Sequence, residues 1–257
     1  MKFKKVTAIY FSPTSGSLSN AMAVAEGTGL PMGSIDMTAL KNAPLGEISF
    51  GSDEIVVLGA PCYGGRIPEI ASSRFSLLEG NDTPCIVTVT YGNRHYDDAL
   101  VELCDLAQSH GFIPIAAAAL IAKHTYGHIA ESRPDEIDLE TTRLFGQKAV
   151  CGAEKAIIDV TPSVPGNRPY KDGGKGGIFR PSTTDACVKC SKCVSECPTG
   201  AISDDCRTID NAKCLACFRC ISVCPMKAKV MDSEEYRAFA EGFTQKLSVP
   251  RKNLYIL

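Results

Sequence analysis

The sequence predicts an α/β protein in which a doubly wound parallel sheet is followed by a small, cysteine-rich α+β domain. Three observations predict this fold. Apolar runs alternate with helix-like segments through residues 1–160, a stretch rich in proline and glycine follows at 161–183, and eight of the thirteen cysteines form two regular blocks within 184–257. At 257 residues, the chain is long enough for two domains with these boundaries.

The composition is that of an ordinary globular protein, with 44% hydrophobic and 22% charged residues. A net charge of −2 gives no reason to expect nucleic acid or an anionic membrane as a partner. The longest apolar run, Phe112–Ala122, contains Pro114 and is too short to span a bilayer. The apolar run behind the basic N-terminus already ends at Phe11, which does not fit a signal peptide, so we expect a cytoplasmic protein.

Runs of β-branched and other apolar residues predict the strands of the first domain. They lie at Val6–Phe11, Glu54–Ala60, Cys85–Thr90 and Phe112–Ala122, with a weaker strand at Ser34–Met37. Because the runs lack strict alternation, we expect a parallel sheet that is buried on both faces. Helix-like segments lie between and after them, at Ser17–Glu26, Glu69–Leu78, Tyr96–His110 and Glu136–Ile158.

Doubly wound sheets bind ligands at the carboxyl ends of their strands. In the order 2-1-3-4-5, strands 1, 3 and 4 are neighbours, so the loops that follow them meet at one edge. The candidate ligand-binding residues in these loops are Ser12, Thr14, Ser15, Gly16 and Ser17, then Pro61, Cys62, Tyr63, Gly64 and Gly65, and finally Tyr91, Gly92, Asn93, Arg94 and Tyr96.

The first loop has the composition of a phosphate site, because hydroxyl side chains and Gly16 precede a helix N-terminus. It contains no Lys or Arg and matches neither the P-loop nor the dinucleotide fingerprint. A single terminal phosphate, as in FMN, is left as the expected ligand. The alternative is a helix cap rich in Ser and Thr.

Aromatic and polar residues of the other loops suit a flavin ring. Tyr63 and Tyr91 could flank the ring, and Arg94 could stabilise its reduced anionic form, although both tyrosines could also be half-buried surface residues. His124 ends the fifth strand; a structural role is favoured over that of a proton donor or substrate contact. Cys62 is either redox-active or a small buried side chain, and the latter is commoner.

The two cysteine blocks, Cys187–Pro198 and Cys214–Pro225, each have the spacing C-x2-C-x2-C-x3-C-P. This spacing is that of 4Fe–4S ligands, and the cysteine before proline binds the other cluster. Structural zinc is disfavoured, since zinc sites pair two C-x2-C knuckles. The first thiol set is therefore Cys187, Cys190, Cys193 and Cys224, and the second thiol set is Cys214, Cys217, Cys220 and Cys197.

The segment 183–231 resembles bacterial-type two-cluster ferredoxins. The three loops, together with His124-Thr-Tyr126, resemble those of prokaryotic flavodoxin–ferredoxin fusion proteins; one departure is Ser15, where Gly often occurs. The resemblance implies a flavodoxin-like domain with FMN and a redox function with ferredoxin-type donors or acceptors. The expected function is a low-potential relay between the clusters and FMN. A cluster-fed reductase of a small molecule, such as a quinone, nitro or unsaturated compound, and a non-catalytic redox sensor are the alternatives.

Two segments outside these motifs remain. The connection at 161–183 either lies over the domain interface or is a flexible tether. A helix is expected at Glu234–Gln245, and the tail Lys246–Leu257 is too apolar to hang free, so we expect it to pack on the body.

Overall fold

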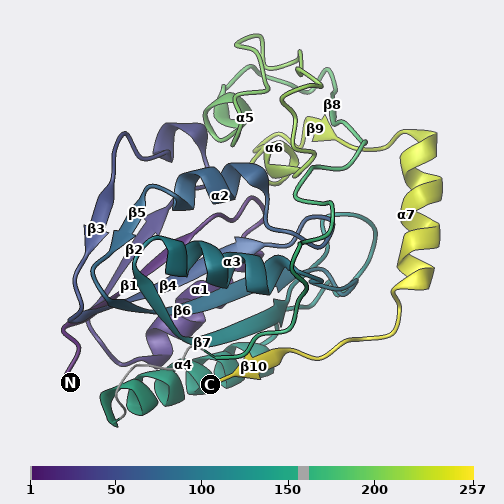
Figure 1. Cartoon of the computed structure of the whole chain (residues 1–257). Coiled ribbons are helices and arrows are strands. Elements are labelled where there is room, and N and C mark those ends of the chain that lie inside the picture. Colours follow the sequence, from purple (N-terminus) through teal and green to yellow (C-terminus); the bar gives the residue numbers. More distant parts are fainter. Residues whose placement is uncertain (1, 156–161) are drawn as a thin grey trace.

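The structure, a computed structural model, describes residues 2–155 and 162–257 (Figure 1). Its main sheet has the order β10-β7-β6-β4-β1-β2. Five strands are parallel and reproduce the predicted order 2-1-3-4-5: β1 (Lys5–Tyr10), β2 (Met32–Asp36), β4 (Glu54–Pro61), β6 (Thr83–Tyr91) and β7 (Phe112–Ile121). The predicted doubly wound, flavodoxin-like sheet is thus confirmed.

Strand register brings the three predicted loops to one edge of the sheet. Ile9 lies beside Leu58, and Leu58 lies beside Val87, so β1, β4 and β6 end at neighbouring points. All nine residues of β6 are buried, because helices cover both faces of the sheet.

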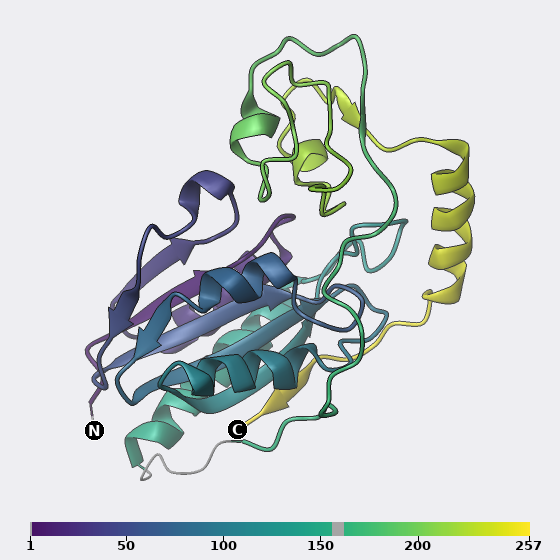
Figure 2. The same ribbon diagram turned by 45° about the horizontal axis from the view of Figure 1, so that its top comes forward.

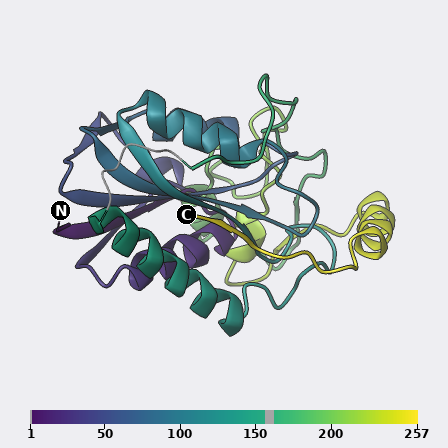
Figure 3. The same cartoon turned by 60° about the horizontal axis from the view of Figure 1, so that its bottom comes forward.

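Helices form a layer on each side of the sheet (Figure 3). One layer holds α1 (Gly16–Gly27) and α4 (Glu136–Lys155), and the other holds α2 (Glu69–Phe75) and α3 (Ala99–Ser109). The predicted end of the fourth helix, Ile158, lies outside the described residues. The third helix begins three residues later than predicted.

Short elements that the sequence did not predict extend the first domain. A 3-10 turn, η1 (Leu40–Asn42), precedes a second parallel pair made of β3 (Ile48–Phe50) and β5 (Leu78–Gly80). Both lie on the connections between β2 and β6, and η1 is on the side that faces the cysteine blocks (Figure 1).

The cysteine-rich region lies over the carboxyl ends of the parallel strands (Figure 2). Its duplication is visible in the backbone. The blocks carry one-turn helices, α5 (Lys192–Ser195) and α6 (Arg219–Ser222), which start after the matching left-handed residues Ser191 (φ 57°) and Phe218 (φ 58°). The short strands β8 (Ser182–Thr183) and β9 (Lys229–Val230) pair antiparallel, and α7 (Glu234–Lys246) follows.

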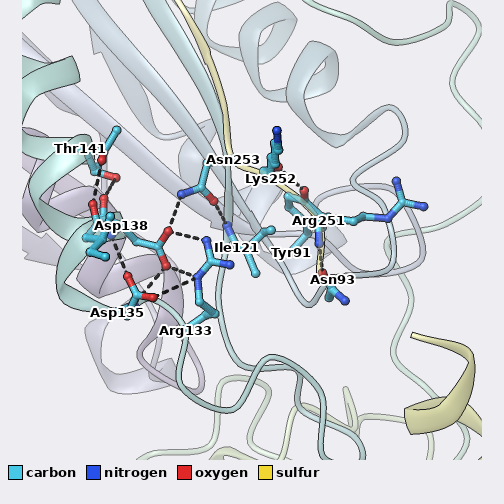
Figure 4. A network of polar contacts seen from close by, with 12 residues as sticks. Tyr91, Asn93, Ile121, Arg133, Asp135, Asp138, Thr141, Arg251, Lys252 and Asn253 are labelled. Carbon is cyan, nitrogen blue, oxygen red and sulfur yellow. Dashed lines mark hydrogen bonds and ion pairs between the residues drawn. The ribbon is translucent and has the colours of Figure 1, made fainter. Parts of the chain in front are cut away.

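The C-terminal tail returns to the sheet of the first domain, in agreement with the expectation that it packs on the body. Strand β10 (Leu254–Ile256) pairs antiparallel with β7, with Tyr255 beside Ala118. Asn253 bridges the Ile121 N–H and the Asp138 carboxylate (Figure 4). Burying these apolar residues against the sheet edge explains why the tail is not free.

The connection between the domains is bound along α3 over residues 166–171. The Asp98 carboxylate accepts hydrogen bonds from the N–H groups of Asn167 (2.8 Å) and Lys171 (2.8 Å), and Arg168 pairs with Asp105 (2.5 Å). These contacts favour the interface role over the flexible tether. The hydrogen bonds from Asn167 and Lys171 also occupy the carboxylate of Asp98, the residue that precedes α3.

No helix in the described parts of the chain is long and apolar enough to cross a membrane.

Candidate cofactor sites

A cavity of about 360 Å³ lies where the three loops meet. Most of the ligand-binding residues predicted from the loops line it, and His124 does as well. The predicted residues in its wall are Ser12, Thr14, Gly16, Ser17, Pro61, Cys62, Tyr63, Gly64, Tyr91, Gly92, Arg94 and His124.

The first loop presents unpaired hydroxyl groups to this cavity. The Ser12 hydroxyl accepts a hydrogen bond from the Leu18 N–H (2.9 Å), whereas the Thr14 and Ser17 hydroxyls have no partner among the described residues. A Cβ on Gly16 would lie 2.8 Å from that of Ala122, so glycine is required for this approach. Unpaired hydroxyl donors beside the N-terminus of a helix fit a bound phosphate group.

Four predicted residues do not line the cavity: Ser15, Gly65, Asn93 and Tyr96. Ser15 has a left-handed backbone (φ 68°), which explains why glycine suits this position. The Asn93 amide instead binds the tail: it donates to the carbonyls of Leu247 (2.8 Å) and Val249 (3.0 Å). It also accepts a hydrogen bond from the Arg251 N–H (2.8 Å) (Figure 4).

The other two have neighbours of their own. Tyr96 stacks on His95, with ring centroids 4.8 Å apart, and Gly65 packs against Asp97. The sequence placed all four residues on the correct loops, but it carried no signal for the direction in which each one faces.

His124 is held as a neutral side chain at the cavity wall. Burial lowers its pKa from 6.5 to about 4. The Tyr126 N–H donates to its Nδ1 atom (2.8 Å), which favours the tautomer with the proton on Nε2, although the Tyr126 carbonyl oxygen also lies 3.1 Å from Nδ1. The ring of Phe243 meets the imidazole edge-on at 5.1 Å. A neutral imidazole with a free Nε2–H can donate a hydrogen bond but is not an acid at pH 7.

The buried thiol of Cys62 does not have the setting of a reactive cysteine. Burial raises its pKa to about 12, and its Sγ atom lies 3.6 Å from the His95 carbonyl and 3.5 Å from that of Tyr96. Because the thiolate is the reactive form, these surroundings favour the simple buried role.

A smaller cavity brings together cysteines from both blocks. The whole first thiol set lines it, including Cys224 of the second block, and a fifth cysteine, Cys206, lines it as well. The Ala228 N–H donates to the Cys224 sulfur (3.2 Å), a contact typical of cluster ligands. In the part of the chain that the structure describes, no three His, Cys, Asp or Glu side chains are arranged to hold a single metal ion.

The second thiol set is more deeply buried. Burial raises the pKa of Cys217 to about 12, and the neighbouring Cys220, Cys197 and Cys214 add to the shift. Cys197, from the first block, thus lies with the three thiols of the second block. Backbone N–H groups of Ala201 (3.3 Å) and Ala216 (3.4 Å) donate to the sulfurs of Cys197 and Cys214, respectively.

The second thiol set is also next to the larger cavity. Ala216, between Cys214 and Cys217, is part of the cavity wall, and its carbonyl accepts a hydrogen bond from the Tyr126 hydroxyl (3.1 Å). Burial and then the nearby Cys217 thiol raise the pKa of Tyr126 to about 12. One wall of the larger cavity therefore belongs to a cysteine block.

Charged residues that the sequence analysis did not single out join the two domains. The Glu196 carboxylate pairs with Lys41 of the first domain (2.8 Å) and with Arg219, which also donates to the Pro13 carbonyl of the first loop (3.3 Å). Arg74 donates to the Pro198 carbonyl (2.6 Å). The hydrogen bond from Lys41, with Arg219, lowers the pKa of Glu196 to about 2.

Residues 183–203 match the family described as "4Fe-4S binding domain". No curated protein matches the chain. Similar solved structures include a flavodoxin from the domain Archaea (12% identity, 58% of this chain and 99% of that chain, TM-score 0.38). Another is oxidised Flavodoxin 1 from Bacillus cereus (16% identity, 58% of this chain and 98% of that chain, TM-score 0.42). A third is a putative flavoprotein from Bacteroides uniformis (15% identity, 48% of this chain and 94% of that chain, TM-score 0.35).

The strand order and the family match concern different parts of the chain. The parallel strands, in the order β7-β6-β4-β1-β2, lie in the first 121 residues, and the matched segment contains the first cysteine block. The chain therefore joins a flavodoxin-like α/β fold to a 4Fe–4S binding domain.

Proposed function

We propose that this protein is an iron–sulfur flavoprotein that passes electrons between two 4Fe–4S clusters and FMN. The observation that carries the proposal is the position of Ala216. This residue belongs to the second cysteine block, yet it forms part of the cavity built by the three loops of the sheet. When bound, FMN exchanges one or two electrons and each cluster exchanges one.

The chain offers distinct groups to the two ends of FMN. The Thr14 and Ser17 hydroxyls, with the N-terminus of α1, would hold the phosphate. Tyr63 would border the ring, and the neutral His124 would donate from Nε2. Tyr91 also lines the cavity, but its side chain is buried in the core and its hydroxyl donates to the Lys252 carbonyl of the tail (3.0 Å). Arg94, which pairs with Asp97 (2.5 Å), supplies positive charge at the wall.

The two thiol sets would each hold one cluster, with the ligands crossed between the blocks. The support is that Cys224 shares a cavity with Cys187, Cys190 and Cys193, while Cys197 lies among the others. Such crossing ties the two halves of the domain together.

The cover over the larger cavity favours an electron carrier over a small-molecule reductase. Lys175, Gly176 and Gly177 of the connecting segment and Phe239 and Phe243 of α7 complete its wall. A Cβ on Gly176 would lie 2.0 Å from the Leu215 carbonyl oxygen, so the segment packs directly on the second cysteine block. These groups cover the cavity on the side of the cysteine-rich region, so a flavin bound there would face a cysteine block on that side.

The flavin released by acid should be FMN, because a single loop offers phosphate donors. Thr14→Ala should raise the Kd for FMN about fivefold, equivalent to about 1 kcal/mol, since one donor to a charged phosphate is lost. The Kd is measured by flavin fluorescence quenching on protein stripped of flavin. Thr141→Ala, on the exposed face of α4, is the matched control and should leave the Kd unchanged. Recovery of FAD, or equal effects of the two substitutions, would contradict the site.

A further inference from the structure

The two thiol sets differ in their access to solvent. Cys190 of the first thiol set is exposed, whereas Cys217 and Cys197 of the second thiol set are buried. The second set adjoins the larger cavity through Ala216. If the proposed function holds, on which this inference rests, the first set is the one within reach of another protein.

The surface around Cys190 combines apolar and basic side chains. Val188 of the first block and Met226, which directly follows the second block, line the small cavity, yet they are 61% and 48% exposed. Lys189 follows Val188 and Lys227 follows Met226; both are exposed, and neither has an ion-pair partner among the described residues. We call these four residues with Cys190 the outer face.

Neighbouring charges do not cancel this basic character. Lys192 is exposed and contacts the buried Glu196 (3.4 Å), which Lys41 and Arg219 already neutralise. Asp185 lies near Arg207 (3.5 Å). Asp204 and Asp205 are exposed beside Cys206, which lines the same small cavity, and Asp205 interacts with the cavity-lining Lys229. The outer face itself carries two lysines, unpaired among the described residues, and no acidic residue, although the whole chain has a net charge of −2.

We propose that the outer face docks a small acidic redox protein. An apolar centre with a charged rim is the usual composition of a transient interface, and the lysines would attract and orient an acidic partner. Docking on the outer face would bring the partner to Cys190, the exposed cysteine of the first thiol set. A second copy of this chain or an anionic membrane is the competing occupant.

The test uses the holoprotein and a plant-type 2Fe–2S ferredoxin as the acidic probe. Lys189→Glu/Lys227→Glu should weaken ferredoxin binding at low salt by about tenfold or more and remove most of its salt dependence. Lys148→Glu/Lys155→Glu, on exposed positions of α4, makes the same change in net charge and should alter binding less than about twofold. Carbodiimide cross-links should map to Lys189 and Lys227.

Several results would overturn the proposal. These are unchanged ferredoxin binding in the Lys189→Glu/Lys227→Glu variant, equal weakening in both double variants, or cross-links elsewhere. The proposal would also be overturned if a labelled second copy of the chain, or phosphatidylserine vesicles, bound the outer face and ferredoxin did not displace them. Iron, sulfide and flavin contents are measured on the same samples. A native protein that lacks a cluster or FMN contradicts the proposed function, whereas intact cofactors without docking contradict only this inference.

Discussion

Replacing Cys224 and Cys190 together should cost no more iron than replacing either one alone. Crossed ligation puts both residues in the first thiol set, so each serine variant, and the double variant, should fall from about eight to about four irons per chain. The effect is large because a cubane cluster that loses one thiolate ligand readily releases its iron. The fold around the cluster also depends on the cluster being bound. Iron and sulfide are measured on anaerobically purified protein.

A second pair of variants provides the contrast. Cys197 belongs to the second thiol set, so Cys197→Ser combined with Cys190→Ser should remove about eight irons, leaving almost none. Cys206→Ala is the matched control, because Cys206 lines the same small cavity but belongs to neither set. It should keep about eight irons. If Cys224→Ser with Cys190→Ser empties both sites, each block holds its own cluster and the crossed assignment is wrong.

Glu196→Gln should loosen the joint between the domains. The Glu196 side chain is only 9% exposed, and the variant leaves the Arg219 guanidinium facing a neutral group. The Nε atom of Arg219 is already buried without a hydrogen-bond partner among the described residues, so this cation depends on Glu196. Breaking a buried ion pair from one side is costly. Because Lys41 is half-exposed, we expect a loss of about 2 kcal/mol rather than the full penalty.

The Leu40 amide reports this loss directly, because its N–H donates to the Cys197 carbonyl across the joint (3.2 Å). Its hydrogen exchange should become about thirtyfold faster in Glu196→Gln, which corresponds to about 2 kcal/mol. Glu136→Gln removes an exposed ion pair with Arg143 and should leave that rate unchanged. An unchanged rate in Glu196→Gln would mean that the carboxylate does not hold the joint.

The same carboxylate gives the joint a pH dependence. The pKa of Glu196 is lowered to about 2 from an ordinary 4.5, so the native state binds fewer protons than the unfolded state between these values. The stabilisation is therefore complete above pH 4.5 and is lost as the pH falls through about 2.

The parallel sheet could be predicted because its signals are local. Buried strands such as β6 have continuous apolar runs, and the ligand edge follows from strand order. The cysteine spacing is equally local, since cluster geometry dictates it. The sequence therefore predicted both the parallel sheet and the segment that matches a 4Fe–4S binding domain.

Contacts between distant segments could not be predicted in the same way. The β10–β7 pairing joins Tyr255 to Ala118, and three residues of β10 carry too weak a pattern to indicate a partner. The roles of Asn93 and Arg219 depend on how the tail and the cysteine blocks pack on the sheet. Sequence alone placed Asn93 on the correct loop, but it could not show that the tail occupies its amide.

The central claim is that electrons pass between the clusters and FMN within one molecule. The most direct test reduces the clusters first in a stopped-flow or flash experiment and then follows the flavin absorbance. The account predicts a flavin reduction rate that does not depend on protein concentration, because Ala216 places a cysteine block in the wall of the larger cavity. A rate that rises in proportion to protein concentration would show transfer between molecules and would contradict the account.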